Sequence, residues 1–202
     1  MKNYKLFSGT ANLPLAQKVA REIGVELGKV EILRFADTEC RVWVEEDVKD
    51  KTGILIQSVS PPVDESLMEF LFLADALKRG RPEKLIAVVP YYGYARQDKV
   101  FRKGEAISAQ VVAKTMEAVG VEALITIHLH SLKILSFFKI PVTHLSTVSV
   151  FTSAFNYLTK EKDRWVAVAP DEMAVKWVRE FAQNLGLEAA ILEKKRNYAK
   201  NY

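Results

Sequence analysis

The sequence is poor in cysteine, with Cys40 alone among 202 residues. One cysteine excludes a disulfide within the chain and any metal site built from several cysteines, and it is compatible with a reducing compartment. No apolar run approaches the roughly 18 residues of a membrane-spanning helix, and the segment MKNYKLFSG has no signal-peptide core. We therefore expect a soluble cytoplasmic protein with no membrane partner.

Neither sign of charge dominates the chain, because 29 Lys and Arg residues oppose 25 Asp and Glu residues, for a net charge of +4. This mild positive charge suits a small anionic substrate as well as nucleic acid. The content of hydrophobic residues, 49%, is that of a globular protein and excludes a disordered chain.

Several motifs of common enzyme classes are absent from the sequence. It contains no G-x-x-x-x-G-K-[ST], no G-x-G-x-x-G, no H-E-x-x-H and no G-x-S-x-G. These absences remove support for a standard P-loop, an ordinary dinucleotide site, a zincin metalloprotease and a serine hydrolase.

Short apolar runs alternate with segments of helical periodicity along the whole chain. The predicted strands are Tyr4–Phe7, Val30–Arg34, Arg41–Glu45, Gly53–Gln57, Lys84–Val89, Leu124–Leu129, a short run after Pro141, Trp165–Ala169 and Glu188–Leu192. Helices are predicted between most of them, with Asp64 as one N-cap and Glu105 as another start. This alternation predicts an α/β fold with a mainly parallel sheet. We expect two domains, 1–145 and 146–202, the second too short to complete a sheet like the first.

The longest polar loop, residues 91–104, directly follows the predicted strand Lys84–Val89. It carries four cations within eight residues and is interleaved with aromatic side chains. Arginine matches pairs of phosphate oxygens, and aromatic faces stack on bases. A solvated basic loop is the plainer alternative, but a loop of this length in a compact domain tends to be functional. We favour contact with phosphate or a nucleotide.

Two further polar clusters follow predicted strands. His128 and His130 would share one face if the strand continued through them, which suits a metal or phosphate as well as simple hydrogen bonding. Asp171 follows WVAVA-Pro170, where a carboxylate can bind Mg²⁺ or a sugar hydroxyl, or cap the next helix. The spacing leaves both alternatives open.

At these positions the sequence resembles the ribose-phosphate pyrophosphokinase family. The resemblance is strongest in PYYGYARQDK at 90–99, continuing to GEAIS at 104–108. The remaining segments that resemble the family are RFADTE at 34–39, HLHSLKILSFFKIPVTHL at 128–145, APDEMA at 169–174 and LEKKR at 192–196. The family implies two related phosphoribosyltransferase-type α/β domains, the second incomplete here.

The resemblance implies Mg²⁺-dependent transfer of the diphosphate of ATP to O1 of ribose 5-phosphate. By the same resemblance, Arg96 and Gln97 contact ATP, His130 and Asp171 help to hold Mg²⁺, and Lys194 and Arg196 close over the phosphates. The residues implied to reach the adenine from a neighbouring subunit are Phe35, Asp37 and Glu39. A homodimer or higher homo-oligomer follows, with no nucleic-acid partner.

The sequence also departs from the family pattern. Thr38 stands where many relatives have glycine, which fits poorly if the hairpin requires a positive φ, and His128 replaces an acid of the signature. No Asp-Asp pair and no Thr-Gly-Gly occurs in the sequence. The chain is thus expected to be C-terminally shortened and to bind ribose 5-phosphate weakly or not at all by itself. A catalytically silent regulatory or assembly subunit is the alternative function, and a nucleic-acid-binding module is a third.

Overall fold

Five parallel strands form the central sheet of the protein, in the order β1-β4-β5-β6-β7. The structure is a computed structural model that describes residues 3–193. The sheet strands are β1 (Tyr4–Ser8), β4 (Thr52–Ile56), β5 (Lys84–Val89), β6 (Ala123–Ile127) and β7 (Val142–Leu145). Each adjacent pair is parallel and in continuous register, as in the pairing of Ile127 with Leu145. The predicted α/β fold with a mainly parallel sheet is confirmed.

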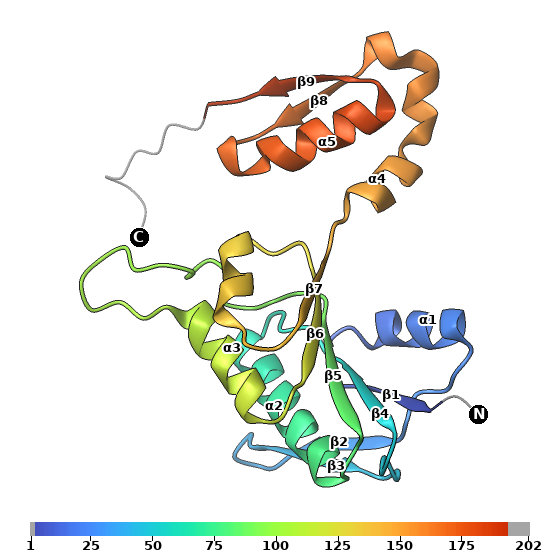
Figure 1. The fold of residues 1–202 in the computed structure, drawn as a ribbon, viewed down its shortest axis with the longest axis vertical. Helices are drawn as coiled ribbons and strands as arrows, with labels where there is room; N and C mark the ends of the chain where they lie inside the picture. The colour runs from blue at the N-terminus through green and yellow to red at the C-terminus, as the bar shows by residue number, and fades with distance from the viewer. Residues whose placement is uncertain (1–2, 194–202) are drawn as a thin grey trace. The chain divides into compact units, whose positions relative to one another are not determined.

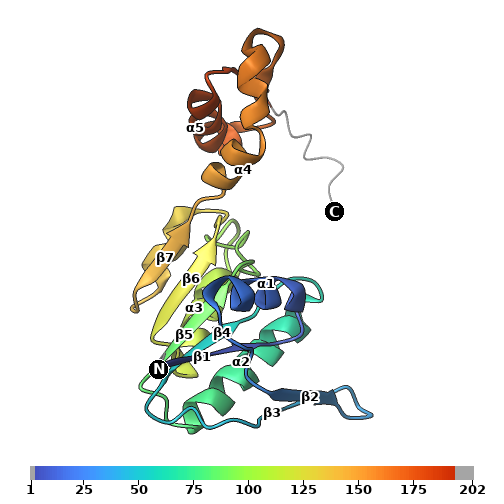
Figure 2. The same ribbon diagram turned by 90° about the vertical axis from the view of Figure 1, so that its right-hand side faces the viewer.

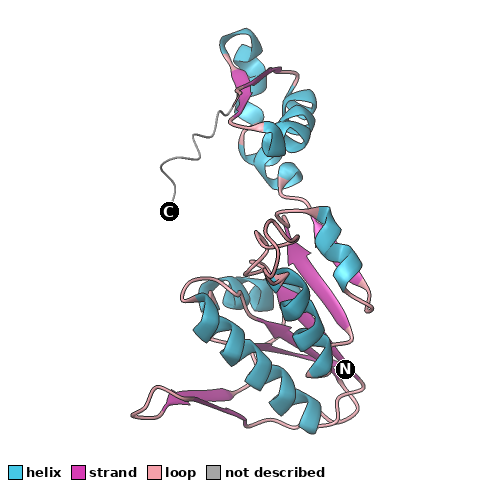
Figure 3. Cartoon of the chain, turned by 90° about the vertical axis from the view of Figure 1, so that its left-hand side faces the viewer, coloured by secondary structure: helices cyan, strands magenta, loops and turns pink. Residues whose placement is uncertain are grey.

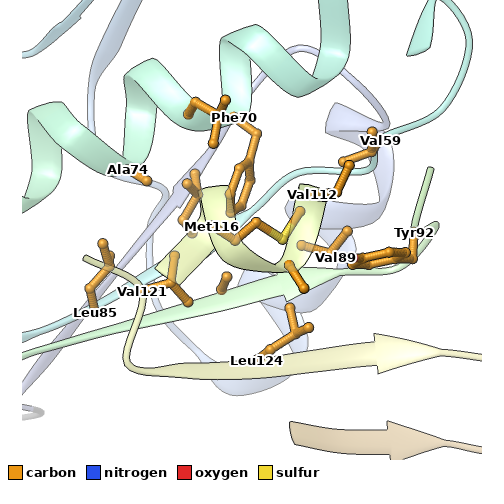
Figure 4. Close-up of a cluster of buried hydrophobic side chains, with 14 of the residues drawn as sticks. Val59, Phe70, Ala74, Leu85, Val89, Tyr92, Val112, Met116, Val121 and Leu124 are labelled. Atoms are coloured by element: carbon orange, nitrogen blue, oxygen red, sulfur yellow. The ribbon is translucent and has the colours of Figure 1, made fainter. Parts of the chain in front are cut away.

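Helices cover both faces of this sheet unequally. Helices α2 (Val63–Arg79) and α3 (Ser108–Ala118) lie on one face, and α1 (Leu13–Ile23) lies on the other (Figures 1 and 3). The main core lies under α2 and α3, where Phe70 and Met116 are completely buried against the strands (Figure 4). Burying a side chain of this size contributes about 1.5–3 kcal/mol, so this face contributes most of the apolar stabilisation. A smaller core under α1 contains Leu6, Ala16 and Ile56.

Between α1 and β4 the chain forms an antiparallel hairpin of β2 (Val30–Arg34) and β3 (Cys40–Val44). One face of the hairpin packs on α2 and joins the main core through Ile32 and Val42. Arg34 also forms an ion pair with Glu65 of α2, at 2.9 Å. The tip of the hairpin extends away from the sheet (Figure 2).

A buried polar network fixes the loop that follows β1. Glu69 of α2 is 3% exposed, and it accepts hydrogen bonds from the Thr10 backbone N–H at 2.6 Å and from Gln57 Nε2 at 2.9 Å. Gln57, fully buried after β4, accepts the Ala11 N–H through Oε1 at 3.2 Å. A buried carboxylate is tolerated when its oxygens are hydrogen-bonded in this way. The network therefore ties the ends of β1 and β4 to α2.

The chain divides into two compact units, Met1–Leu145 and Ser146–Tyr202. In the second unit, β8 (Val166–Ala169) and β9 (Glu188–Ile191) form a two-stranded parallel sheet, and α5 (Val175–Leu185) packs on β8. Its other helices are α4 (Val148–Ala154) and the 3-10 segments η2 (Asn156–Arg164) and η3 (Glu172–Ala174). Within residues 3–193, no helix combines the length and the apolar character needed to cross a membrane.

Two predicted helix starts were wrong. Helix α2 begins at Val63, directly after Pro62, so Asp64 lies within its first turn and makes no capping hydrogen bond. In the first turn its negative charge interacts favourably with the positive end of the helix dipole. Helix α3 begins at Ser108 rather than at Glu105, because Glu105 belongs to the preceding loop.

Replacing Gly9 with alanine tests the polar network. A Cβ at Gly9 would lie 2.4 Å from Gln57 Oε1 and 2.5 Å from Glu69 Oε1. Both oxygens are held by buried hydrogen bonds, so moving them breaks the network, and we expect Gly9→Ala to lose about 1–3 kcal/mol of stability. Urea unfolding measures the change.

Gly53→Ala is the matched control, because its Cβ would make only an ordinary contact of 3.6 Å with Leu85. This variant should match the unmodified protein or be more stable by up to about 1 kcal/mol. Equal stabilities for both variants would contradict the assigned role of the network.

Candidate functional site

The carboxyl ends of the parallel strands gather polar segments at one edge of the sheet. The long loop 90–107 follows β5, and residues 128–131 follow β6. Because β5 and β6 are paired neighbours, these two segments leave the same edge side by side. A ligand at this edge would contact both segments. The sequence predicted such a contact, with phosphate or a nucleotide, for loop 91–104.

The first part of the loop is buried and firmly anchored. Tyr92 is 4% exposed, its hydroxyl donates to the Ala109 carbonyl at 2.9 Å, and its ring meets Phe138 edge-on. Burial raises the pKa of the Tyr92 phenol far above its usual value, so this side chain is a neutral hydrogen-bond donor. Tyr92 therefore joins the start of the loop to the first turn of α3.

Gln97 is fixed to the same helix, whereas its neighbour Arg96 is not. The Gln97 carbonyl accepts the Ala109 N–H at 3.2 Å, and Gln97 Oε1 accepts a hydrogen bond from the Ser108 hydroxyl. Arg96 is exposed and forms no ion pair within the part of the chain that the structure describes. Its guanidinium is thus available for an anion next to a positioned amide side chain.

The tip of the loop carries the remaining cations in exposed positions. Glu105 accepts the N–H groups of Phe101 and Arg102 at 2.8 and 3.0 Å, which fixes a tight turn. Lys99 Nζ lies 5.0 Å from the centre of the Phe101 ring. Loop 91–104, which extends from the sheet in Figure 1, therefore carries exposed cations and aromatic side chains together, as expected from its composition.

The turn after β6 differs from the predicted strand end. Strand β6 ends at Ile127, and His128 has a positive φ of 47°. His128 and His130 thus do not share a strand face, and both are exposed on either side of the buried Leu129. His144 of β7 accepts the Leu129 N–H through Nε2 at 3.0 Å. Burial, and then His128, lower the pKa of His144, which favours the neutral ring that this bond requires.

The predicted adenine-contacting residues lie at the tip of the β2–β3 hairpin. Phe35 is 51% exposed, and Asp37 and Glu39 are also exposed. Asp37 Oδ1 accepts the Glu39 N–H at 3.1 Å. Thr38 has a φ of 75°, the backbone conformation that favours glycine. The half-buried Cys40 follows, and burial raises the pKa of its thiol, which makes it a poor nucleophile.

Within one chain, the hairpin tip and loop 91–104 lie apart. Figures 1 and 2 show the hairpin apart from the long loop that follows β5, and the Arg34–Glu65 ion pair places the tip-side end of β2 beside the first turn of α2. The structure therefore does not bring Phe35 together with Arg96 in a single copy. A separate open cavity of about 400 Å³ near the end of β1 is lined by Gly9, Thr10 and Lys29 among others, and by none of the predicted site residues.

The other predicted residues belong to the second unit or lie outside the described residues. Asp171 Oδ1 accepts the N–H groups of Met173 and Ala174 at 3.1 and 3.2 Å, so it caps η3 rather than α5. Its capping role is thus present, whatever else it binds. Lys194 and Arg196 lie outside the described residues.

The described residues do not fit a resident magnesium site. Mg²⁺ prefers oxygen ligands in octahedral geometry, and His130 supplies only ring nitrogens. Asp171 has a carboxylate, but one of its oxygens already accepts two amides. No group of three His, Cys, Asp or Glu side chains able to hold a metal occurs among residues 3–193. Any magnesium at this edge would need oxygens from a ligand.

The sequence did not identify the side chains whose hydrogen bonds hold the backbone segments of the candidate site. Glu69 and His144 accept backbone N–H groups of loops at the carboxyl edge, and Tyr92 joins its loop to the Ala109 carbonyl of α3. Only Glu69 carried a signal, as a charged residue among the apolar positions of a helix. The other two required the partner segment to be known.

Comparison with known proteins finds related sequences and a related solved structure. The N-terminal domain of ribose phosphate pyrophosphokinase matches residues 4–120. Ribose-phosphate pyrophosphokinase 1 of Streptococcus pneumoniae is 41% identical over 196 residues, and ribose-phosphate pyrophosphokinase of Fusobacterium nucleatum is 40% identical over 194 residues. The crystal structure of phosphoribosylpyrophosphate synthetase from Mycobacterium smegmatis is similar with a TM-score of 0.90 and 35% identity.

The matches cover nearly all of this chain but only part of each relative. They include 97% of this chain and 61% of the length of the Streptococcus protein, and 96% and 61% for the Fusobacterium protein. For the Mycobacterium structure the shares are 97% and 66%. The chain therefore spans less than two thirds of the relatives that it matches.

Thr38→Gly should stabilise the hairpin tip. A threonine at a φ of 75° is strained, and glycine adopts this conformation without a steric cost. We expect the free energy of unfolding to rise by about 1 kcal/mol. Thermal and urea unfolding measure it.

Ala36→Gly is the control for this variant, since Ala36 lies in the same turn without a positive φ. It should be neutral or slightly destabilising, because glycine there only adds entropy to the unfolded chain. A loss of stability in Thr38→Gly similar to that in Ala36→Gly would show that Thr38 is not strained.

Proposed function

Because the chain belongs to the ribose-phosphate pyrophosphokinase family, we propose that it binds ATP in the transfer of diphosphate to ribose 5-phosphate. In this reaction O1 of the sugar attacks the β-phosphorus of ATP. The bond from that phosphorus to the α,β-bridging oxygen breaks, AMP leaves, and the O1 proton passes to solvent or a base. The observation that carries the proposal is the exposed Arg96 beside the anchored Gln97 at the carboxyl edge of the sheet.

Loop 91–104 supplies the proposed nucleotide contacts. Arg96 donates two N–H groups to phosphate oxygens, and Gln97, held by α3, contributes a directed polar group. Tyr92 keeps the start of the loop on α3, so these donors are in place before the nucleotide arrives. Preorganised donors at a developing negative charge favour the transition state over the bound substrate.

Magnesium enters this proposal as part of the Mg–ATP substrate, where it neutralises phosphate charge. His130, exposed after β6, is the side chain of the neighbouring segment that meets the triphosphate. We assign Asp171 of the second unit to the same ligand. Lys194 and Arg196 are the proposed catalytic cations, which add charge around the β-phosphorus during transfer.

Two copies of the chain share each proposed site. Phe35, Asp37 and Glu39 are exposed on a hairpin that lies far from loop 91–104 of the same copy (Figure 2). An exposed aromatic ring flanked by two acids suits the face and the amino edge of adenine. The hairpin of one copy therefore completes the nucleotide site of another, in a homodimer or a larger homo-oligomer.

Arg96→Ala tests the proposed site directly. A lost pair of charge-assisted hydrogen bonds corresponds to about 1.5–3 kcal/mol, so affinity for a non-hydrolysable Mg–ATP analogue should fall by tenfold or more. Isothermal titration calorimetry measures the Kd, and Arg96→Lys should not restore it. Arg21→Ala, at an exposed arginine of α1, is the control and should bind like the unmodified chain.

AMP release from ATP in the presence of ribose 5-phosphate and Mg²⁺ separates the two candidate roles. Binding together with turnover supports the transferase, and binding without turnover by the 202-residue chain favours the catalytically silent subunit. No nucleotide binding at all, or equal binding by Arg96→Ala, would overturn the proposed site.

Mixing two defective variants tests the shared site. Phe35→Ala and Arg96→Ala should each bind the analogue poorly. In a two-fold dimer, one site of each mixed pair receives both intact segments, so an equal mixture should recover about a quarter of the sites. Calorimetry counts them, and no recovery from a mixture shown to exchange subunits would refute sharing.

A further inference from the structure

The turn after β6 is attached to β7 by two successive hydrogen bonds. The His128 N–H donates to the Leu145 carbonyl at 3.1 Å, which continues the pairing of the two strands. The Leu129 N–H then donates to the His144 ring at Nε2, at 3.0 Å. A side chain thus takes the place of a strand partner at the point where the backbone turns away.

The conformation of this turn requires such support. His128 has a left-handed φ of 47°, which persists in a residue other than glycine only when the surrounding contacts impose it. Leu129 is 9% exposed, so its N–H would lose its hydrogen bond to water without gaining another. The acceptor on His144 removes this cost and holds the left-handed residue in place.

His130 lies between this anchor and a second one. Directly after it, Ser131 caps η1 (Leu132–Phe137), and its Oγ accepts the Lys133 N–H at 3.2 Å. Ile134 of η1 is completely buried. The backbone is therefore fixed on both sides of His130, whose own side chain is exposed at the carboxyl edge.

The geometry points to His144 as a positioning residue for the nucleotide. Through the Leu129 N–H it sets the turn that presents His130 to the phosphates, without touching the nucleotide itself. This inference rests on the proposed function. It adds a requirement that the proposed function does not contain: Nε2 of His144 on β7 must be unprotonated, so that it can accept the Leu129 N–H.

The first experiment examines the hydrogen bond in the unmodified 202-residue chain. NMR spectroscopy detects a scalar coupling across an N–H···N hydrogen bond, here between the Leu129 amide nitrogen and His144 Nε2. We expect this coupling and a His144 ring that carries its proton on Nδ1. A His144 ring protonated at Nε2 at neutral pH would overturn the inference, and this measurement does not depend on whether any variant folds.

The second experiment uses His144→Leu and His144→Gln. Leucine fills similar space without an acceptor, whereas the glutamine side chain reaches as far and keeps a carbonyl oxygen. In His144→Leu, the rate of hydrogen exchange at the Leu129 amide should rise. The Kd for the Mg–ATP analogue should increase by about tenfold, the change expected from the loss of one hydrogen bond. His144→Gln should restore both values to within about twofold.

A double-mutant cycle with His130→Ala distinguishes positioning from a general loss of structure. If His144 acts through His130, then adding His144→Leu to His130→Ala should change the Kd by less than about twofold. Full additivity of the two changes would show that His144 acts elsewhere and would overturn the inference.

Failure of the inference and failure of the proposed function give different results. If the unmodified chain binds the analogue, Arg96→Ala does not, and His144→Leu binds normally, the inference is wrong and the proposed function stands. If the unmodified chain does not bind the analogue, the proposed function is wrong and the inference falls with it.

Discussion

The parallel pairing of β5, β6 and β7 is the constraint on which the candidate site depends. In a parallel sheet every carboxyl end meets the same edge, so each loop that follows a strand is delivered to one place. The in-register pairs Val89–Thr126 and Ile127–Leu145 bring the ends of the three strands together. Segments far apart in the sequence thereby become neighbours.

Hydrogen bonds from buried or half-buried side chains then fix the conformations of these segments. Tyr92 holds the start of the long loop, Glu69 holds the loop after β1, and His144 holds the turn after β6. Glu69 of α2 and His144 of β7 accept backbone N–H groups of the loops that follow strands, and Tyr92 of the loop itself donates to the Ala109 carbonyl of α3. Exposed groups such as Arg96 and His130 are consequently carried on backbone that is already ordered.

The hairpin shows how far a fold can be read from sequence. The strands Val30–Arg34 and Cys40–Val44 follow from their composition, and the predicted second strand differed by one residue at each end. The sequence left open whether the hairpin requires a positive φ at Thr38, and the structure has a φ of 75° there. Where the hairpin tip lies relative to loop 91–104 was not predictable, because it depends on how the hairpin packs against α2.

The sequence by itself determined the α/β class, most strands and the basic, aromatic character of loop 91–104, because periodicity and composition are local properties. It also carried the family resemblance, which the comparisons confirm. Only the tertiary structure decided that His128 leaves the strand, that Gln97 is bound to α3 and that His144 supports Leu129. The two histidine features depend on hydrogen bonds between the ends of β6 and β7, which exist only once the sheet has aligned these strands, and the Gln97 feature depends on how the long loop folds back onto α3.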